Sequence, residues 1–166
     1  MRILIIGIDG YLGWALAQYL GARNYKVGGI DALYRRDHVM EVGSISATPI
    51  ANPSERLIAF KEHFGEDLYW IQGDITNWAI IKKTFEEFLP DAVVHLGECP
   101  SAPFSMIDRK HAVWVQKNNV IGSLNILYAI KEITPDAHLV KLGTMGEYGT
   151  PNIDIPEGFF EIEYRG

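Results

Sequence analysis

The chain has 166 residues, of which 48% are hydrophobic and 22% charged, and its formal net charge is -6. This composition predicts one globular domain and argues against nucleic acid or an anionic membrane as partner, because both bind a basic face. No stretch approaches the roughly 18 apolar residues of a membrane helix, and the apolar start is too short for a signal peptide. The single cysteine, Cys99, excludes an internal disulfide and a zinc cluster, so we expect a cytoplasmic location and no metal.

Short aliphatic runs alternate with helical patterns along the chain, as in βαβ units. Helices are expected over residues 11–21, from Thr76 or Asn77 onward, and over 112–133. Between residues 31 and 57 we expect a long loop that leads into a helix. The aliphatic runs read as strands buried on both faces of a sheet, at 3–6, 26–30, 68–71, 92–95 and 138–142. Because crossovers between parallel strands are right-handed, the expected fold is α/β, a Rossmann-type doubly wound parallel sheet.

Three glycines stand between the first expected strand and the first expected helix, in the stretch GIDGYLGW. In a dinucleotide-binding loop the first glycine allows a tight turn and the second lets the backbone approach the pyrophosphate. The third lets the helix pack closely on the strand. The N–H groups and dipole of the helix attract the anion. The stretch therefore predicts a cofactor site that includes Gly7, Asp9, Gly10, Tyr11, Leu12 and Gly13.

Charged residues around this loop favour NAD as the cofactor. Asp31 ends the second expected strand, where a carboxylate accepts hydrogen bonds from the adenosine ribose and repels a 2′-phosphate. Arg35 and Arg36 follow, and they could clamp a 2′-phosphate, stack on adenine or form a solvated pair. Asp9 places a negative charge inside the glycine loop. We predict that Asp9 is held by backbone donors or by a nearby cation, away from the phosphates.

The third and fourth expected strands end at further candidate cofactor residues. Asp74 can accept a hydrogen bond from the adenine amino group while Ile75 packs on the ring, and Asp74 can also cap the next helix. Leu96, Gly97 and Glu98 reach the crevice in which an α/β sheet binds ligands, and Gly97 lets a cofactor pass close to the backbone. For Glu98 itself a solvated carboxylate is the simpler interpretation.

Polar residues of the second half have both structural and functional interpretations. His95 lies within an apolar strand and is expected to be a hydrogen-bonded core histidine. Asn119, in the long helix, can brace the backbone of a neighbouring strand, hold a water or lie on an exposed face. Leu142 ends the fifth expected strand and is a further candidate cofactor residue. Thr144 stands where that strand meets the crevice, and its hydroxyl can hydrogen-bond a substrate hydroxyl.

The last residues alternate apolar and charged side chains, with Phe160, Ile162 and Tyr164 on one face, which predicts a half-buried strand. A strand without its partner is an unusual natural end, so we expect a truncated chain. The predicted organisation is an NAD-binding domain over residues 1–150, followed over 151–166 by the start of a strand or hairpin that leads into a missing substrate-binding part.

Several longer segments occur together: GIDGYLGW, GDI, SAPFSMIDR, NNVIGSLNILYAIKE and KLGTMGEYGTPNIDIPEG. In combination they resemble the UDP-sulfoquinovose synthases, which are members of the extended short-chain dehydrogenase/reductase superfamily. The resemblance implies tightly held NAD and a UDP-sugar substrate. It implies hydride abstraction from C4 of UDP-glucose, loss of water across C5–C6, addition of sulfite at C6 and return of the hydride. It also implies a homodimer through two long helices, with residues 112–133 as a candidate.

By position, the resemblance carries site residues onto this chain. Thr144 matches the catalytic threonine, which binds the sugar 4-hydroxyl beside a Tyr/Lys pair, and Glu147 could assist the proton transfers of the elimination. The substrate site would include Ser101 and Met145. The resemblance also supports the cofactor roles of the three glycines and of Asp31, Asp74 and Asn119.

The chain departs from the family pattern at three points. Pro100 replaces an arginine and Ala32 replaces an asparagine. No tyrosine here is followed by lysine in the pattern Tyr-x-x-x-Lys, so this pair is expected beyond Gly166 and the chain alone is expected to be inactive. Two alternatives stay open. Pro100 favours another nucleotide-sugar enzyme, such as a UDP-glucose 4-epimerase or a dehydratase, and the missing pair favours a non-catalytic dinucleotide-binding module.

Overall fold

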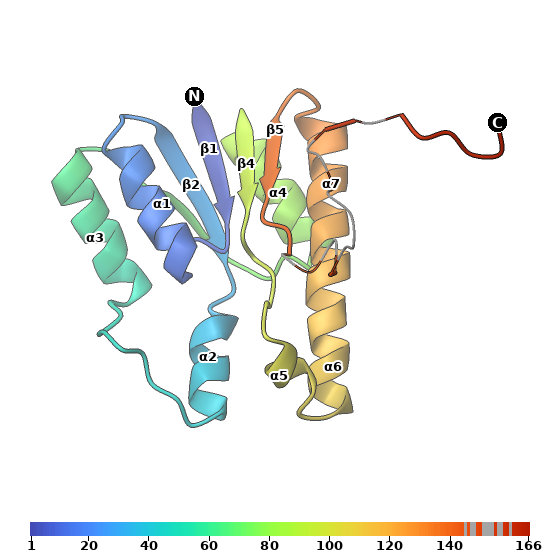
Figure 1. The fold of residues 1–166 in the computed structure, drawn as a ribbon. Coiled ribbons are helices and arrows are strands. Elements are labelled where there is room, and N and C mark those ends of the chain that lie inside the picture. Colours follow the sequence, from blue (N-terminus) through green and yellow to red (C-terminus); the bar gives the residue numbers. More distant parts are fainter. Residues whose placement is uncertain (145, 147–148, 151–154, 156–157, 160) are drawn as a thin grey trace.

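Five parallel strands form a sheet in the order β3-β2-β1-β4-β5 in the computed structural model (Figure 1). The structure describes residues 1–166 except 145, 147–148, 151–154, 156–157 and 160. The order of the strands reverses between β1 and β4, which makes the sheet doubly wound and confirms the expected fold. The strands are β1 (Arg2–Ile6), β2 (Lys26–Asp31), β3 (Tyr69–Gln72), β4 (Ala92–His95) and β5 (His138–Lys141).

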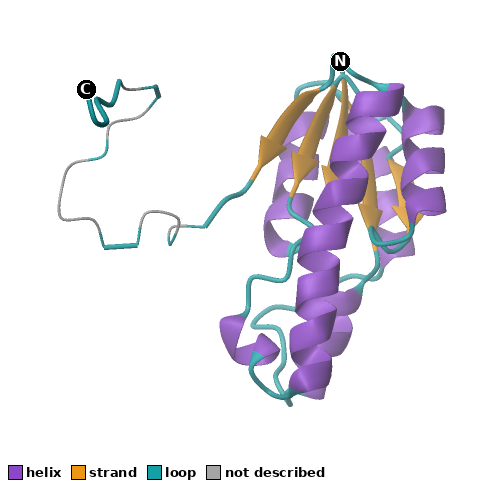
Figure 2. Ribbon diagram, turned by 90° about the vertical axis from the view of Figure 1, so that its right-hand side faces the viewer, coloured by secondary structure: helices purple, strands orange, loops and turns teal. Residues whose placement is uncertain are grey.

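Helices cover both faces of the sheet, and a group of them extends beyond the carboxyl ends of the strands (Figure 1). A π-helical turn, Lys117–Ile121, joins α6 to α7 in one continuous column (Figure 2). Within the described residues, no helix is long and apolar enough to cross a bilayer. The α-helices are α1 (Tyr11–Gly21), α2 (Tyr34–Glu41), α3 (Pro53–Phe64), α4 (Trp78–Phe88), α5 (Ala102–Ser105), α6 (Arg109–Gln116) and α7 (Gly122–Ile133).

The alternation of side chains along β1 creates two hydrophobic cores. Ile3 and Ile5 pack on the face covered by α1 and α3, in a cluster that includes Phe60. Leu4 and Ile6 point to the opposite face and pack with residues of α4 and α7. Successive residues of a strand face opposite sides, so a strand covered on both faces needs apolar residues at every position. This explains the continuous aliphatic run.

Side-chain caps set the starts of the helices around the sheet. Asn77 caps α4 by accepting hydrogen bonds from the backbone N–H groups of Ala79 and Ile80, so Asn77 rather than Thr76 is the cap. Asn52 and Glu55 form a reciprocal capping box at the start of α3. These local signals are readable in the sequence.

Element α2 contradicts the long loop predicted between residues 31 and 57. Its sequence, YRRDHVME, carries no apolar stripe, so hydrophobic periodicity could not find it. Its contacts are aromatic instead, with the His38 ring 4.3 Å from the rings of both Phe104 and Trp114, centroid to centroid. Tertiary packing therefore stabilises a helix whose own sequence is weakly helical.

Other boundaries differ by a few residues from those expected. Strand β3 lies one residue later, β5 ends at Lys141 rather than Leu142, and the long helix begins at Arg109, where Asp108 caps it. The predicted terminal strand is wrong for residues 161–166, which have no regular secondary structure, with Ile162 and Tyr164 about three-quarters exposed. A strand needs a partner, and no described segment pairs with this one. The domain boundary at residue 150 stays a prediction.

Candidate functional site

A cavity of about 800 Å³ opens at the carboxyl ends of the strands, between the glycine loop, α2 and the segments after β4 and β5. It lies at the point where the strand order reverses, which is where doubly wound sheets bind ligands. Most of the residues selected from the sequence meet here. They are Gly7, Asp9, Gly10, Tyr11, Leu12, Gly13, Asp31, Arg35, Ile75, Leu96, Gly97, Glu98, Asn119, Leu142 and Thr144.

The glycine loop forms a cradle that side chains would fill. Gly7 has a φ of +85°, and a Cβ atom there would lie 2.9 Å from the backbone of Leu96 and Gly97. A Cβ atom at Gly13 would overlap the carbonyl oxygen of Gly7, so only glycine lets α1 start so close to β1. Gly10 precedes α1 and has no side chain to cap it, which leaves the first N–H groups of α1 for an anion. The cradle fits a pyrophosphate.

The Asp31 carboxylate lies at the end of β2 on the wall of this cavity. Its Oδ2 accepts a hydrogen bond of 2.8 Å from the backbone N–H of Asp9, and its Oδ1 accepts one of 2.7 Å from that of Leu33. Burial raises the pKa of the Asp31 carboxyl above its usual value, and the two backbone donors oppose this rise. Each oxygen keeps a lone pair for a ribose hydroxyl.

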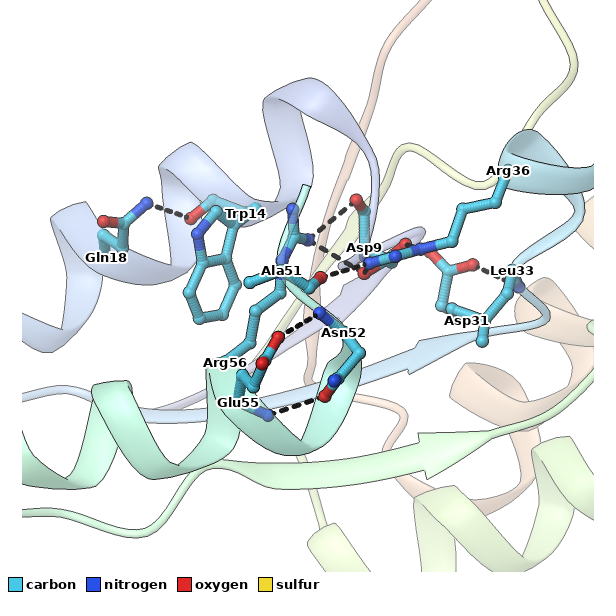
Figure 3. Close-up of polar contacts among 10 residues, drawn as sticks. All are labelled: Asp9, Trp14, Gln18, Asp31, Leu33, Arg36, Ala51, Asn52, Glu55 and Arg56. Carbon is cyan, nitrogen blue, oxygen red and sulfur yellow. Dashed lines mark hydrogen bonds and ion pairs between the residues drawn. The ribbon is translucent and has the colours of Figure 1, made fainter. Parts of the chain in front are cut away.

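Asp9 is buried and paired with two cations, as predicted for it (Figure 3). Arg36 donates to it through Nε (2.6 Å to Oδ2) and Nη2 (2.8 Å to Oδ1). Arg56 donates through Nη1 to Oδ1 at 2.8 Å and to the Asp9 carbonyl at 2.9 Å. The Arg56 guanidinium also lies 4.8 Å from the ring centroid of Trp14. The carboxylate is therefore neutralised by α2 and α3, and the negative charge in the loop is accounted for.

The two adjacent arginines of α2 have different surroundings. Arg35 lines the cavity, whereas Arg36 does not and also donates to the carbonyl of Ala51 at 2.7 Å. The hydrogen bond to Asp9 raises the pKa of Arg36, opposed by partial burial. Arg36 is thus held by Asp9 and Ala51 and is not a solvated residue. Arg56, its partner on Asp9, gave no functional signal in the sequence.

Asp74 is held by a residue that the sequence did not suggest. The hydroxyl of Tyr34, at the start of α2, donates to Asp74 Oδ2 at 3.0 Å. Oδ1 accepts from the backbone N–H of Thr76 at 2.7 Å. Asp74 therefore closes a turn and does not cap α4, which Asn77 caps. Ile75 is buried and lines the cavity beside it.

Two asparagines of the π-helical turn brace the cavity wall. Asn119 accepts from the N–H of Cys99 at 2.9 Å and donates to its carbonyl at 3.1 Å. Asn118 is buried and donates to the carbonyl of Gly97 at 3.1 Å. Asn119 therefore braces the backbone of the loop after β4 and not that of a neighbouring strand, one of the roles considered for it from the sequence, and its role toward a cofactor stays a prediction. Such π turns are frequent at functional sites.

His95 and Glu98 form a polar network beneath the same wall. The buried His95 accepts from the N–H of Gly97 through Nδ1 at 3.3 Å, and its Nε2 lies 3.0 Å from Ser123 Oγ. Burial lowers the pKa of His95 to about 4, so it is a neutral core histidine, as predicted. Glu98 accepts from Ser123 at 2.9 Å and from Lys141 at 3.1 Å. The expectation of a solvated Glu98 is therefore wrong. Lys141 lies 43 residues further along the chain and is next to Glu98 only in the folded sheet, so the sequence did not indicate this pair.

The predicted catalytic and substrate residues are only partly placed by the structure. Thr144 lines the cavity, and its Oγ1 accepts from the N–H of Gly146 at 3.1 Å. Ser101 caps α5 through a 3.3 Å hydrogen bond from Phe104 and does not line the cavity. Met145 and Glu147 lie outside the described residues. In the part of the chain that the structure describes, no cluster of His, Cys, Asp or Glu could hold a metal ion.

Comparisons with known proteins agree with this architecture. The model of the NAD dependent epimerase/dehydratase family matches residues 3–163. Among curated proteins, chloroplastic UDP-sulfoquinovose synthase of Spinacia oleracea is 51% identical over 165 residues, covering 99% of this chain and 34% of that protein. UDP-sulfoquinovose synthase of Sulfolobus acidocaldarius is 49% identical over 160 residues, covering 96% of this chain and 41% of that protein. The chain thus spans about a third to two-fifths of these relatives.

Solved structures share the fold at much lower identity. A UDP-glucose 4-epimerase from Bifidobacterium longum, in complex with NAD+ and UDP, has a TM-score of 0.69 at 19% identity, over 92% of this chain and 40% of that one. A UDP-glucose 4-epimerase from Brucella ovis, in complex with NAD, has a TM-score of 0.66 at 21% identity, over 92% of this chain and 38% of that one.

Proposed function

The chain belongs to the NAD dependent epimerase/dehydratase family, and on that premise we propose that it forms the NAD-binding part of an enzyme that converts UDP-glucose and sulfite to UDP-sulfoquinovose. The observation that carries the proposal is the identity of about one half, along nearly the whole chain, to two UDP-sulfoquinovose synthases. The geometry supports it, because the glycine loop, Asp31 and Thr144 line one cavity.

The residues of the cavity suit NAD in type and position. The N–H groups of Tyr11 and Leu12 would bind the pyrophosphate, Asp31 would accept from the ribose hydroxyls, and Ile75 and Arg35 would contact the adenosine. When bound, NAD takes a hydride from the sugar and later returns it. The absence of side chains at Gly7 and Gly13 supports this assignment, because it lets the loop and the start of α1 pack directly on the backbone at the end of the sheet.

On the sugar side, the Thr144 hydroxyl at the cavity wall would hold the 4-hydroxyl of UDP-glucose. Oxidation at C4 acidifies the proton on C5, so a modest base suffices for loss of water across C5–C6. Sulfite then adds at C6 before the hydride returns. We assign the assisting carboxylate to Glu147 and substrate contacts to Met145 and to Ser101, which caps α5 beside the cavity residue Pro100.

The sequence contains no Tyr-x-x-x-Lys pair. Since a tyrosine made acidic by a nearby lysine is the proton acceptor that this chemistry needs at the 4-hydroxyl, we propose that the 166-residue chain by itself binds NAD without turnover.

A homodimer is part of the proposal. Apolar side chains at helical spacing along α6, the π turn and α7 lie on the outer face of that column, about half exposed. They are Val113, Val120, Leu124 and Leu127. A second copy of the chain would cover them.

The test needs two measurements. Isothermal titration of the chain with NAD+ should show one site per chain. In addition, a protein that joins this chain to a segment carrying Tyr-x-x-x-Lys should form a sulfonated nucleotide sugar from UDP-glucose and sulfite, detected by mass spectrometry. UDP-galactose formed without a sulfonated product would instead establish a 4-epimerase, the alternative that Pro100 favours. Absence of NAD+ binding would refute the proposed function.

A further inference from the structure

Four charged groups meet where the glycine loop touches the end of β2. They are Asp9, Asp31, Arg36 and Arg56, and their formal charges cancel (Figure 3). Asp9 is the central member, because its carboxylate binds both arginines while its own N–H binds Asp31. The carboxylate beside the glycine loop and the carboxylate proposed for the ribose are therefore direct neighbours.

The two arginines contribute differently to this cluster. The Arg56 side chain is 9% exposed, is held over Trp14 and contacts both the side chain and the backbone of Asp9. The Arg36 side chain is 24% exposed and reaches Asp9 from α2 through its Nε and Nη2 groups. Arg56 is thus the more buried of the two cations, and Arg36 is the more exposed one, which a rotation about its side-chain bonds could turn away from Asp9.

We propose that Asp9 is a specificity residue of the cofactor site, which holds Arg36 in an ion pair and so withholds it from the 2′-phosphate of NADP. This inference rests on the proposed NAD-binding function. A 2′-phosphate carries about -1.5 to -2 charges and would lie beside Asp31. Arg36 and Asp31 both bind Asp9, Arg36 at 2.6 Å to its carboxylate and Asp31 at 2.8 Å from its N–H, so the two lie beside each other (Figure 3). A phosphate beside Asp31 would thus lie close to the guanidinium that Asp9 binds.

Charge and geometry both support this role. The Nε and Nη2 groups of Arg36 donate to Asp9, and Nη2 also donates to the carbonyl of Ala51. A bidentate pair with a buried carboxylate is among the stronger polar contacts. A phosphate would have to compete with it while facing two negative carboxylates. NADP binding is thus opposed in two ways. Asp31 repels the 2′-phosphate, and Arg36, the cation of this cluster that could turn toward the phosphate, is bound to Asp9.

The experiment measures the dissociation constants of NAD+ and NADP+ for the purified chain by isothermal titration calorimetry. Asp9→Asn should tighten NADP+ binding relative to NAD+ by about tenfold, the size of one charge-assisted contact. Arg36→Gln added to Asp9→Asn should abolish that gain. The matched control, Arg23→Gln added to Asp9→Asn, replaces an arginine that lies over Tyr19 outside the cavity and should keep the gain in the NADP+ to NAD+ ratio. Arg35→Gln added to Asp9→Asn separately tests the arginine that lines the cavity.

The outcomes separate this inference from the function on which it rests. Wild-type protein that binds no NAD+ refutes both. If the wild-type protein binds NAD+, two results would overturn the role of Asp9 but not the proposed function. One is an unchanged ratio of NADP+ to NAD+ affinity in Asp9→Asn, and the other is a gain in that ratio that persists when Arg36→Gln is added. A gain abolished by Arg35→Gln rather than Arg36→Gln also overturns it.

A second pair of variants keeps Asp9 intact in case Asp9→Asn does not fold. Asp31→Ala removes the repulsion and admits NADP+. If Asp9 withholds Arg36, adding Arg36→Gln to Asp31→Ala should change NADP+ affinity by less than about twofold. A loss of about tenfold in NADP+ affinity on adding Arg36→Gln would show that Arg36 contacts the 2′-phosphate even when Asp9 is present, and would overturn the inference.

Discussion

The backbone N–H of Asp9 donates a 2.8 Å hydrogen bond to Oδ2 of Asp31, which ties the glycine loop to the end of the neighbouring strand. The loop is consequently held from two sides, by Asp31 at its backbone and by Arg36 and Arg56 at its side chain. The glycine loop, where we propose that the pyrophosphate binds, is thereby held by contacts within the protein, and such preorganisation lowers the entropic cost of binding.

Replacement of Asp31 by alanine should weaken NAD+ binding by about tenfold or more and affect NADP+ much less. The variant loses the acceptor for the ribose hydroxyls but also loses the repulsion of a 2′-phosphate. Titration of both nucleotides measures the two constants. Asp37→Ala, an exposed carboxylate of α2, is the matched control and should change neither constant appreciably. Equal losses for the two nucleotides in Asp31→Ala would contradict the ribose assignment.

Replacement of Gly13 by alanine should displace α1 from β1, because the added Cβ atom would overlap the carbonyl oxygen of Gly7. We expect a loss of about 2–3 kcal/mol in the free energy of unfolding, measured in urea, together with loss of NAD+ binding. Gly43→Ala is the control. It has a φ of +68° but open space around it, so it should cost only about 1 kcal/mol. Similar costs for the two variants would refute the steric role of Gly13.

Replacement of Arg56 by methionine should destabilise the protein by about 3 kcal/mol, because it leaves the buried Asp9 carboxylate with one of its two cations. Methionine keeps most of the apolar stem beside Trp14, so the decrease in the free energy of unfolding measures the effect of removing the charge. Lys61→Met breaks the exposed pair with Asp67 and should cost at most about 1 kcal/mol in the same urea titration. A cost for Arg56→Met no larger than that of Lys61→Met would show that the Asp9 cluster does not stabilise the fold.

Acid should destabilise the protein through His95. Its pKa in the folded protein is about 4, below the ordinary value of 6.5, so the unfolded chain binds the proton more readily between these values. The free energy of unfolding should therefore fall as the pH drops from 6.5 toward 4, by about 3 kcal/mol at most from this group. His95→Gln should flatten that slope in urea titrations at a series of pH values. An unchanged slope would mean that His95 is accessible to protons in the folded state.

The strands, α1 and the glycine loop could be read directly from the chain. An aliphatic run buried on both faces, a glycine pattern at a strand-to-helix turn and a cap such as Asn77 are local signals, and each needs only its neighbours in sequence. The carboxylate at the end of β2 was found the same way, because strand ends in a doubly wound sheet converge on one crevice. The sequence by itself therefore determined the fold class and the place of the cavity that we propose for the cofactor.

Only the tertiary structure decided how the charges around that site are paired. Arg56 lies 47 residues from Asp9, Tyr34 lies 40 from Asp74, and Lys141 lies 43 from Glu98, and none of these pairs has a local signature. Helix α2 likewise exists because its aromatic side chains pack on Phe104 and Trp114. The physical reason is that a buried charge or a polar helix is stable only beside a specific partner, and the packing of the whole sheet and its helices chooses that partner.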